Sequence, residues 1–95
     1  FIRVKANLLT RTPEIIKNLF HTDLNVIKDD DRQKQWTTAI LYINTNNGYT
    51  EFKSGEIVES VENRFVSFPA NIPHRGTSCT DAKIRIVINF NYFNE

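Results

Sequence analysis

The sequence is poor in the features that mark several large classes of protein. Its 95 residues include a single cysteine, Cys79, which excludes an internal disulfide framework and weakly favours a reducing compartment. The net charge of only +1 gives no electrostatic footprint for DNA, RNA or an anionic membrane. Apolar runs extend over only a few residues, so no segment is predicted to span a bilayer.

Targeting and linker signals are also missing. Residues 1–9, FIRVKANLL, alternate charge and apolarity and lack the apolar core of a signal peptide. No repeat or low-complexity linker interrupts the chain, and its length suits one domain, predicted over residues 1–95. The chain starts at Phe1 instead of a methionine, so a longer parent protein is also considered.

Short runs rich in β-branched and aromatic residues dominate what is present, and turn signals separate them. About eight short strands are predicted, over residues 1–9, 20–24, 36–44, 49–53, 56–60, 64–68, 76–79 and 83–93. One helical turn is predicted at 12–20, with Thr12 as its N-cap, and a solvated loop at 25–35. This pattern indicates an all-β sandwich or barrel of jelly-roll type with little helix.

The last predicted strand has two unlike faces, because side chains two residues apart share a face. One face is apolar and consists of Ile84, Ile86, Ile88 and Phe90; the other consists of Arg85, Val87, Asn89 and Asn91. An arginine on the inner face of a small sandwich needs a partner, since an unpaired buried charge is costly. A bound carboxylate would suit the planar fork of Arg85.

The two histidines of the chain complete a possible metal site. His21 and Asp23 are two residues apart on an extended segment, so their side chains point to the same side. His74 follows 51 residues after Asp23, and a jelly roll can bring such distant strands side by side. Two imidazoles and one carboxylate on one face of an ion form the facial triad of non-haem Fe(II) oxygenases. Arg85 follows eleven residues after His74.

These residues, in this order, resemble the 2-oxoglutarate- and Fe(II)-dependent dioxygenases, and among them the prolyl-4-hydroxylase-like oxygenases, which include short phage and marine microbial members. The resemblance runs from Ile2 to Phe93 and implies a double-stranded β-helix, a jelly-roll or cupin-like fold. The segments that carry it are HTD (21–23), TTAILYIN (37–44), GYTEF (48–52), FPANIPH (68–74) and RIVINFNYF (85–93).

The resemblance implies a ligand set and a reaction. His21, Asp23 and His74 would be the catalytic metal ligands and would bind Fe(II), with 2-oxoglutarate as cosubstrate and ascorbate to keep the iron reduced. The reaction expected is hydroxylation of a peptide, an amino acid or a small metabolite, with release of succinate and CO2. The location expected is the cytoplasm, or the host cytoplasm if a phage encodes the protein.

The resemblance also implies a cosubstrate pocket. Arg85 would bind the distal carboxylate of 2-oxoglutarate, and Tyr42 would donate a hydrogen bond to the same group. Asn7 and Asn89 would be polar residues of this pocket. Thr38 and Ile40 share the strand parity of Tyr42 and would line it as well.

Ordinary structural roles and other functions stay open. Tyr42 could simply pack in the core, Arg85 could lie at a solvated sheet edge, and the two asparagines could be generic polar residues of strands. One alternative function is an AlkB-like nucleic-acid demethylase, although nucleic acid is not expected as a partner because no basic stripe is present. The other is a non-catalytic, cupin-like metal-binding module.

One departure from the resembled family concerns the apolar face of the last strand. The family's helices before the first strand, which cover the larger sheet, have no counterpart in this sequence. The face formed by Ile84, Ile86, Ile88 and Phe90 therefore has no evident cover. We expect either a homo-oligomer packed through this face or a fragment of a longer chain.

Overall fold

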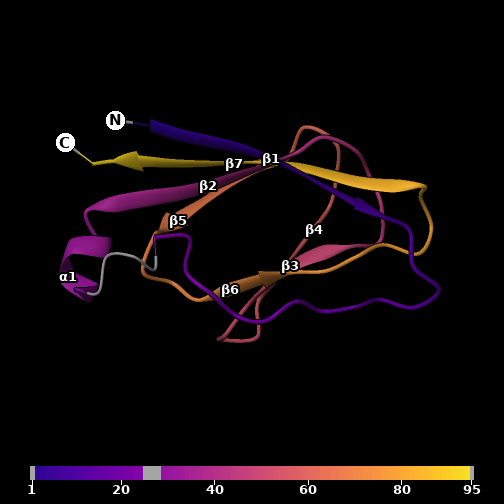
Figure 1. Ribbon diagram of the computed structural model, residues 1–95, viewed down its shortest axis with the longest axis horizontal. Coiled ribbons are helices and arrows are strands. Elements are labelled where there is room, and N and C mark those ends of the chain that lie inside the picture. The colour runs from indigo at the N-terminus through magenta and orange to yellow at the C-terminus, as the bar shows by residue number, and fades with distance from the viewer. Residues whose placement is uncertain (1, 25–28, 95) are drawn as a thin grey trace.

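The protein is a sandwich of two antiparallel sheets, seen as two layers in Figure 1. The computed structural model describes residues 2–24 and 29–94. In chain order the elements are β1 (Ile2–Thr10), α1 (Asp30–Gln33), β2 (Trp36–Tyr42), β3 (Tyr49–Phe52), β4 (Ile57–Glu59), β5 (Phe65–Pro69), β6 (His74–Gly76) and β7 (Ile84–Phe93). The larger sheet has the order β1-β7-β2-β5 and the smaller β4-β3-β6, which confirms the predicted all-β jelly-roll class.

The core lies between the two sheets and is built from alternating strand residues. Its buried members are Ile40, Tyr42, Phe52, Phe68 and Val87. The rings of Phe52 and Phe68 meet edge to face across the layers, 4.8 Å between centroids. Arg85 and Val87 are both buried on the inner face of β7, as its alternation predicted.

A segment without regular structure completes the smaller sheet beside β6. Isolated bridges join Lys17 to Thr77 and His21 to His74, and the backbone N–H of Asn18 donates to the carbonyl of Gly76 at 3.0 Å. The strand predicted at 20–24 is therefore reduced to a single bridge at His21. The segment nevertheless brings both histidines to the same place in the fold.

The helical turn predicted at residues 12–20 is wrong. The hydroxyl of Thr12 lies 2.6 Å from that of Ser78 and donates to the carbonyl of Glu14, so it caps no helix. The backbone N–H of Ser78 donates to the carbonyl of Ile16, which holds this stretch extended against the chain after β6. Tertiary pairing has overridden the local helix signal.

Other sequence-based boundaries also shift. Within the loop predicted at 25–35 the structure has the short helix α1, capped by the Asp29 carboxylate, which accepts from the N–H of Asp31. Residues 25–28 of that loop lie outside the described residues. The strand predicted near 76–79 occurs earlier, as β6. In the part of the chain that the structure describes, no helix is long and apolar enough to cross a membrane.

Candidate metal centre

His21, Asp23 and His74 converge at one end of the sandwich. Asp23 Oδ1 lies 3.2 Å from His21 Nε2 and 3.3 Å from His74 Nε2, and one ligand atom from each residue falls within 4.8 Å of the others. His21 and His74 exchange backbone hydrogen bonds of 2.9 and 3.0 Å, so their side chains share one face. The site thus combines β6 with a neighbouring segment that is distant in sequence.

Each imidazole is oriented by a contact between its Nδ1 and the backbone carbonyl two residues earlier. Nδ1 of His21 lies 3.3 Å from the carbonyl oxygen of Leu19, and Nδ1 of His74 lies 3.1 Å from that of Ile72. A carbonyl can only accept a hydrogen bond, so Nδ1 carries the proton in each ring. Nε2 of a neutral ring then offers its lone pair toward Asp23, as metal-ligating histidines do.

This arrangement calls for a cation. With both Nδ1 atoms protonated, two neutral imidazoles and the Asp23 carboxylate present only acceptors to one another. Either protons on the rings or a metal ion must lie between them. Two imidazoles and one carboxylate are a ligand set that suits Fe(II), and the remaining side of such a site stays open. The residues present therefore fit a divalent metal.

The Asp23 side chain is only 8% exposed and is held by a neighbouring amide. The amide of Asn91 donates to Asp23 Oδ2 at 3.2 Å and to the hydroxyl of Thr38 at 3.0 Å. Burial acts to raise the pKa of Asp23, but hydrogen bonds from His21 and His74, which form when Nε2 of each ring carries a proton, outweigh it and hold that pKa well below its ordinary range. The hydrogen bond to Asp23 in turn raises the pKa of His21.

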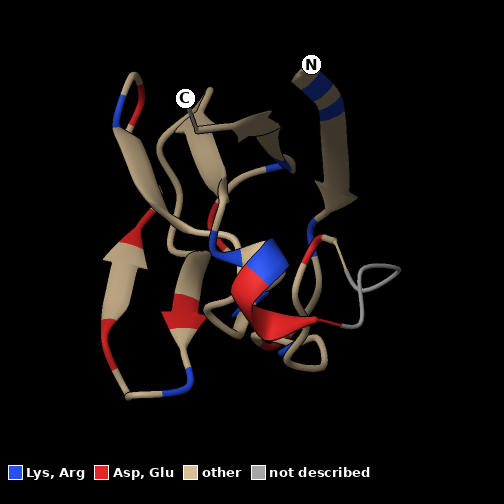
Figure 2. Ribbon diagram, turned by 90° about the vertical axis from the view of Figure 1, so that its left-hand side faces the viewer, with Lys and Arg blue, Asp and Glu red and all other residues tan. Residues whose placement is uncertain are grey.

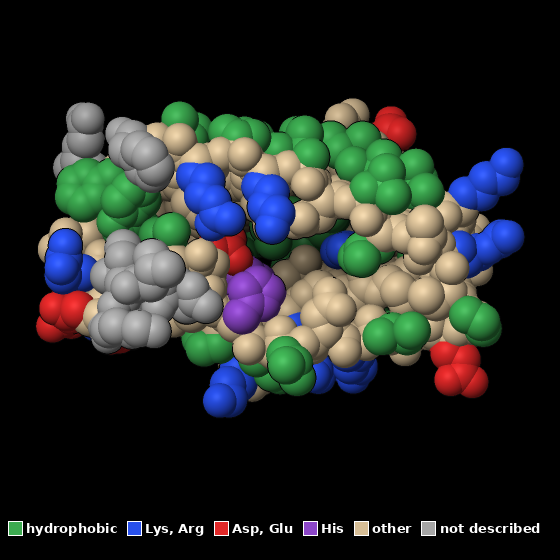
Figure 3. Space-filling model, in the orientation of Figure 1, with side chains coloured by type: hydrophobic (Ala, Val, Ile, Leu, Met, Phe, Trp, Pro, Cys, Tyr) green, Lys and Arg blue, Asp and Glu red, His purple; other side chains and the backbone are tan. Residues whose placement is uncertain are grey.

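A cavity of about 300 Å³ connects the metal centre to Arg85. His21 and His74 line one part of it and Arg85 another. Figure 3 shows the hollow on this face, with histidine at its rim and Lys or Arg atoms inside. Ile40 and Val87 form part of an apolar wall. One cavity is thus lined by two of the three candidate metal ligands and by a positive charge.

Arg85 is 3% exposed and lacks a carboxylate partner among residues 2–24 and 29–94. Its Nε donates to the hydroxyl of Ser60 at 3.1 Å, and its guanidinium lies 5.9 Å from the centre of the Tyr42 ring. Burial lowers the pKa of Arg85. A ligand carboxylate would supply the missing counter-charge.

The other predicted pocket residues lie near this cavity in different ways. The Tyr42 ring belongs to the core, and its hydroxyl donates to Thr50 at 2.7 Å, whose side chain borders the cavity. Burial raises the pKa of Tyr42. Asn7 and Asn89 both border the cavity, whereas Thr38 lies beneath Asp23, hydrogen-bonded to Asn91.

Sequence reasoning missed two residues that support the site, Asn91 and Lys5. Asn91 is hydrogen-bonded to Asp23, and Lys5 borders the cavity beside His21. Strand parity was an available signal for both, since Asn91 shares the inner face of Arg85 and Lys5 lies directly opposite Asn89 in the β1–β7 register.

Comparison with known proteins identifies the fold. The sequence matches no known family and no curated protein. Among solved structures, it aligns with a non-heme monooxygenase, ThoJ, in complex with nickel, at TM-score 0.70 and 9% identity over 96% of this chain. A cupin protein from Bacteroides fragilis aligns at TM-score 0.64 and 12% identity over 97%. The protein has the cupin fold. The Fe(II) enzyme HppE, solved with its substrate, aligns at TM-score 0.61 and 10% identity over 96%.

These neighbours are longer than the chain. It spans 65% of the Bacteroides protein, 45% of HppE and 42% of ThoJ. At identities of 9 to 12% the likeness shows the fold alone. These neighbours include an Fe(II) protein and a non-heme monooxygenase, and the triad of this chain is a possible metal site in the same fold.

Proposed function

We propose that the protein is an Fe(II)- and 2-oxoglutarate-dependent oxygenase that hydroxylates a small metabolite, an amino acid or a peptide. One observation carries the proposal: a cavity of about 300 Å³ is lined both by two imidazoles of the triad and by the buried guanidinium of Arg85. A dicarboxylate that chelates a metal at one end and meets an arginine at the other satisfies both groups.

In this reaction the chain's own residues would bind, orient and exclude water. His21, Asp23 and His74 would hold the metal, and Arg85 would bind the distal carboxylate of 2-oxoglutarate. When bound with 2-oxoglutarate and oxygen, Fe(II) would supply the chemistry that inserts one oxygen atom into a C–H bond of the substrate. The second oxygen atom would enter the succinate that forms, together with CO2, from 2-oxoglutarate. The apolar side chain of Val87 would exclude water from the cavity.

Contacts between the histidine rings and neighbouring groups of the protein would hold the ligands in place. The carbonyls of Leu19 and Ile72 keep both histidine Nε2 atoms turned toward the metal position. Phe68 packs edge-on against His74, with 4.9 Å between ring centroids. These contacts support the proposal because they arrange the ligands before a metal arrives.

The test combines binding and turnover. The protein is prepared without oxygen and given Fe(II) and 2-oxoglutarate, and the visible metal-to-ligand absorption band is recorded. Oxygen is then admitted and succinate is measured with and without candidate substrates. Absence of both the band and succinate would overturn the oxygenase assignment and favour a non-catalytic metal-binding cupin module.

Two variants separate the metal ligands from the cosubstrate residue. His74→Ala should abolish iron binding. Arg85→Ala should leave iron binding in place and raise the 2-oxoglutarate requirement, by the loss of a charged hydrogen bond of about 1.5–3 kcal/mol. Intact iron binding by Arg85→Ala and by Arg85→Lys, which keeps the charge but not the fork, checks that any loss is not caused by misfolding. An unchanged 2-oxoglutarate requirement in both arginine variants would remove Arg85 from the site.

A further inference from the structure

A second cavity, of about 200 Å³, adjoins the metal centre on its β1 side. It is bordered by His21 and Asp23 and, on the inner faces of β1 and β7, by polar side chains. These polar side chains include Arg3, Lys5, Asn7 and Asn89. At about 30 Å³ for each water, the space suits about six or seven non-hydrogen atoms.

Two cations border this cavity, and both come from β1. Figure 2 shows the Lys and Arg bands on that strand, which correspond to Arg3 and Lys5. Arg3 donates to the backbone carbonyl of Asp23 at 3.4 Å, while Lys5 makes no ion pair or hydrogen bond with any residue in 2–24 or 29–94. Lys5 and His21 border this cavity together, which places Lys5 beside the metal centre.

The nearby acid is already engaged. The oxygens of the Asp23 carboxylate face Asn91 and both histidines, and no ion pair joins Asp23 to Lys5 among the described residues. A cavity lined by unneutralised positive charge attracts an anion. Lys5 is exposed and unpaired among the described residues, so its charge is available to an acidic group on a ligand.

Asn89 supplies a second recognition element. It lies directly opposite Lys5 in the β1–β7 register, where side chains on one face are about 4.5–5.5 Å apart at Cβ. Its Oδ1 is buried without a hydrogen-bond partner, and no other described residue that is not exposed has such a side-chain atom. A buried acceptor left unsatisfied is costly, so a donor is expected to meet it.

We propose that this second cavity receives the oxidisable substrate, and that the substrate is a small acid that also carries a hydroxyl or amino group. Lys5 binds the acid, and Asn89 Oδ1 accepts from the hydroxyl or amine. Lys5, Asn7 and Asn89 border both cavities, and Asn7, whose side chain is also without a described partner, is available to the same ligand. The identification of the ligand as the oxidisable substrate rests on the proposed oxygenase function. The binding site itself does not.

Three matched compounds test the site on metal-free protein, where chelation cannot contribute. They are 4-hydroxybutyrate, butyrate and 1,4-butanediol, which carry the acid and the hydroxyl, the acid alone, and the hydroxyl alone. Ligand-observed NMR titration measures each dissociation constant. We expect 4-hydroxybutyrate to bind more tightly than butyrate, and the diol to bind most weakly.

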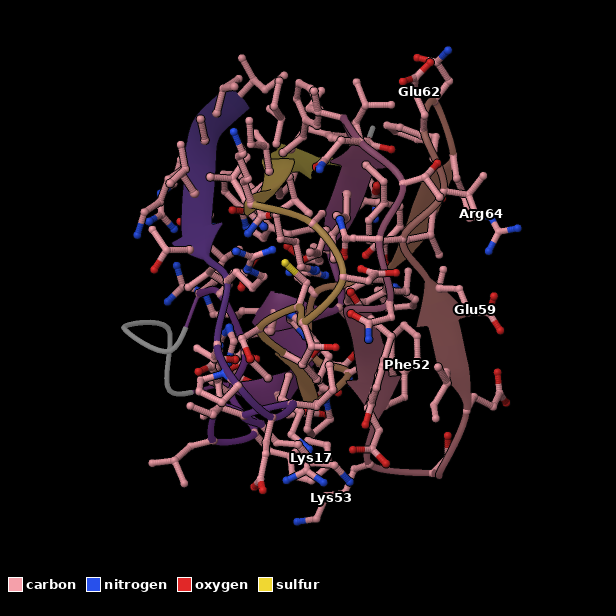
Figure 4. The ribbon with its side chains drawn as sticks, turned by 90° about the vertical axis from the view of Figure 1, so that its right-hand side faces the viewer. Lys17, Phe52, Lys53, Glu59, Glu62 and Arg64 are labelled. Carbon is pink, nitrogen blue, oxygen red and sulfur yellow. The ribbon has the colours of Figure 1, made fainter. Side chains whose placement is uncertain are left out.

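Variants assign the two contacts. Lys5→Gln should weaken binding of both acids about tenfold or more, with the diol unaffected. Asn89→Leu should remove the preference for 4-hydroxybutyrate over butyrate. Lys53→Gln is the control, since Lys53, labelled in Figure 4, lies on the turn between β3 and β4 and its side chain lines neither cavity. Equal acid binding by wild type and Lys5→Gln, or no binding of any compound to the wild type, would overturn the inference.

The outcome is independent of the oxygenase test. These titrations use neither iron nor 2-oxoglutarate, so their failure leaves succinate formation unaffected as a prediction. Conversely, a protein that binds 4-hydroxybutyrate through Lys5 but forms no succinate keeps this site and loses the proposed reaction.

Discussion

At the scale of single residues, Gly48 controls whether Arg85 can enter the cavity. A Cβ atom at residue 48 would lie 2.5 Å from Arg85 Cδ and 2.8 Å from Arg85 Nε, closer than real contacts allow. The Arg85 side chain occupies the space that a side chain at residue 48 would need. Arg85 can therefore take this position only because residue 48 is a glycine.

Gly48→Ala should displace the Arg85 guanidinium. We expect it to weaken 2-oxoglutarate binding about as much as loss of the arginine contact does, while metal affinity stays unchanged. Both are measured by titration of the visible absorption band. Gly55→Ala is the control, because residue 55 has φ +101° but open space around it, so it should cost about 1 kcal/mol of stability and leave the cosubstrate unaffected. Normal 2-oxoglutarate binding by Gly48→Ala would contradict this account.

The pair of His21 and Asp23 predicts how stability of the metal-free protein depends on pH. The hydrogen bond to Asp23 raises the pKa of His21 above its ordinary 6.5, so its stabilising contribution is present below pH 6.5 and is lost as pH rises through the raised value. The lowered pKa of Asp23 keeps its contribution present above its ordinary 3.8. Urea unfolding should therefore give greater stability at about pH 6 than at about pH 8.

Two comparisons check that this pH effect comes from the pair. Asp23→Asn should lose the difference in stability between the two pH values. Saturating metal should reverse its direction, since the metal binds neutral imidazole and competes with protons. A wild-type protein that is equally stable at both pH values without metal would show that the pair contributes nothing.

Residue-level prediction succeeded where the signal was local. The inward direction of Arg85 follows from the two-residue period of extended chain. His21 and Asp23 do come together, as predicted, but Asp23 lies in a turn and not on a strand. The contacts of Arg85 with Ser60 and Gly48 do not follow from that period, because they depend on which strands lie next to each other. The unpaired Oδ1 of Asn89 likewise becomes visible only when its neighbours are placed.

At the scale of elements, the segment before His21 needs an anchor because it pairs with β6 through few bridges. Arg75 on β6 provides it: the guanidinium lies 4.1 Å above the Phe20 ring and donates to Glu51 at 2.7 Å. Lys17 lies 3.8 Å from the same carboxylate, and Figure 4 shows its position at this end of the molecule. The cluster fixes the backbone next to His21.

Phe20→Leu should loosen this anchor without changing a metal ligand. A cation–π contact at an exposed site is worth about 0.5–1 kcal/mol, so we expect metal affinity to fall about two- to fivefold. Titration with Co²⁺ measures it. Phe65→Leu, the same change on a strand of the larger sheet, is the control and should leave Co²⁺ affinity unchanged. Equal affinity in both variants would show that Phe20 does not position His21.

The sequence predicted strands correctly where apolar and polar residues alternate along them. It failed where hydrogen bonds to distant segments determine the backbone conformation. The span of β7 agrees with the prediction to within one residue at its start because its apolar and polar residues alternate throughout. The stretch 12–20 has a helix-start signal in Thr12 and Pro13, yet pairing with the chain around β6 keeps it extended. Such long-range hydrogen bonds leave no local pattern in the sequence.

At the scale of the whole molecule, the outer face of the larger sheet is apolar and uncovered. By strand parity it includes Ile84, Ile86, Ile88 and Phe90 of β7, Val4 and Leu8 of β1, and Phe65 of β5. Val4, Leu8 and Phe65 are 56%, 59% and 56% exposed. Figure 3 shows hydrophobic side chains gathered along the edge over β1 and β7. No outward position on these four strands is charged.

We expect a second copy of the chain to cover this outer face. Strands about 4.8 Å apart and about 3.4 Å per residue give four strands a face on the order of 600 Å², close to what one partner contributes to a standard interface. Two uncharged faces can meet without burying an unpaired charge. Sedimentation equilibrium should therefore give about twice the chain mass of 11.1 kDa.

Val4→Lys places a charge in this interface and should shift the protein toward monomer, because burying an unpaired lysine costs more than the contact gains. Ile57→Lys is matched to it, since Ile57 is 51% exposed on β4 of the other sheet, and it should leave the mass unchanged. Neither residue borders the cavities, so metal binding should survive in both variants. A wild-type protein that sediments as a monomer at every concentration would contradict self-association and leave the outer face for a different partner.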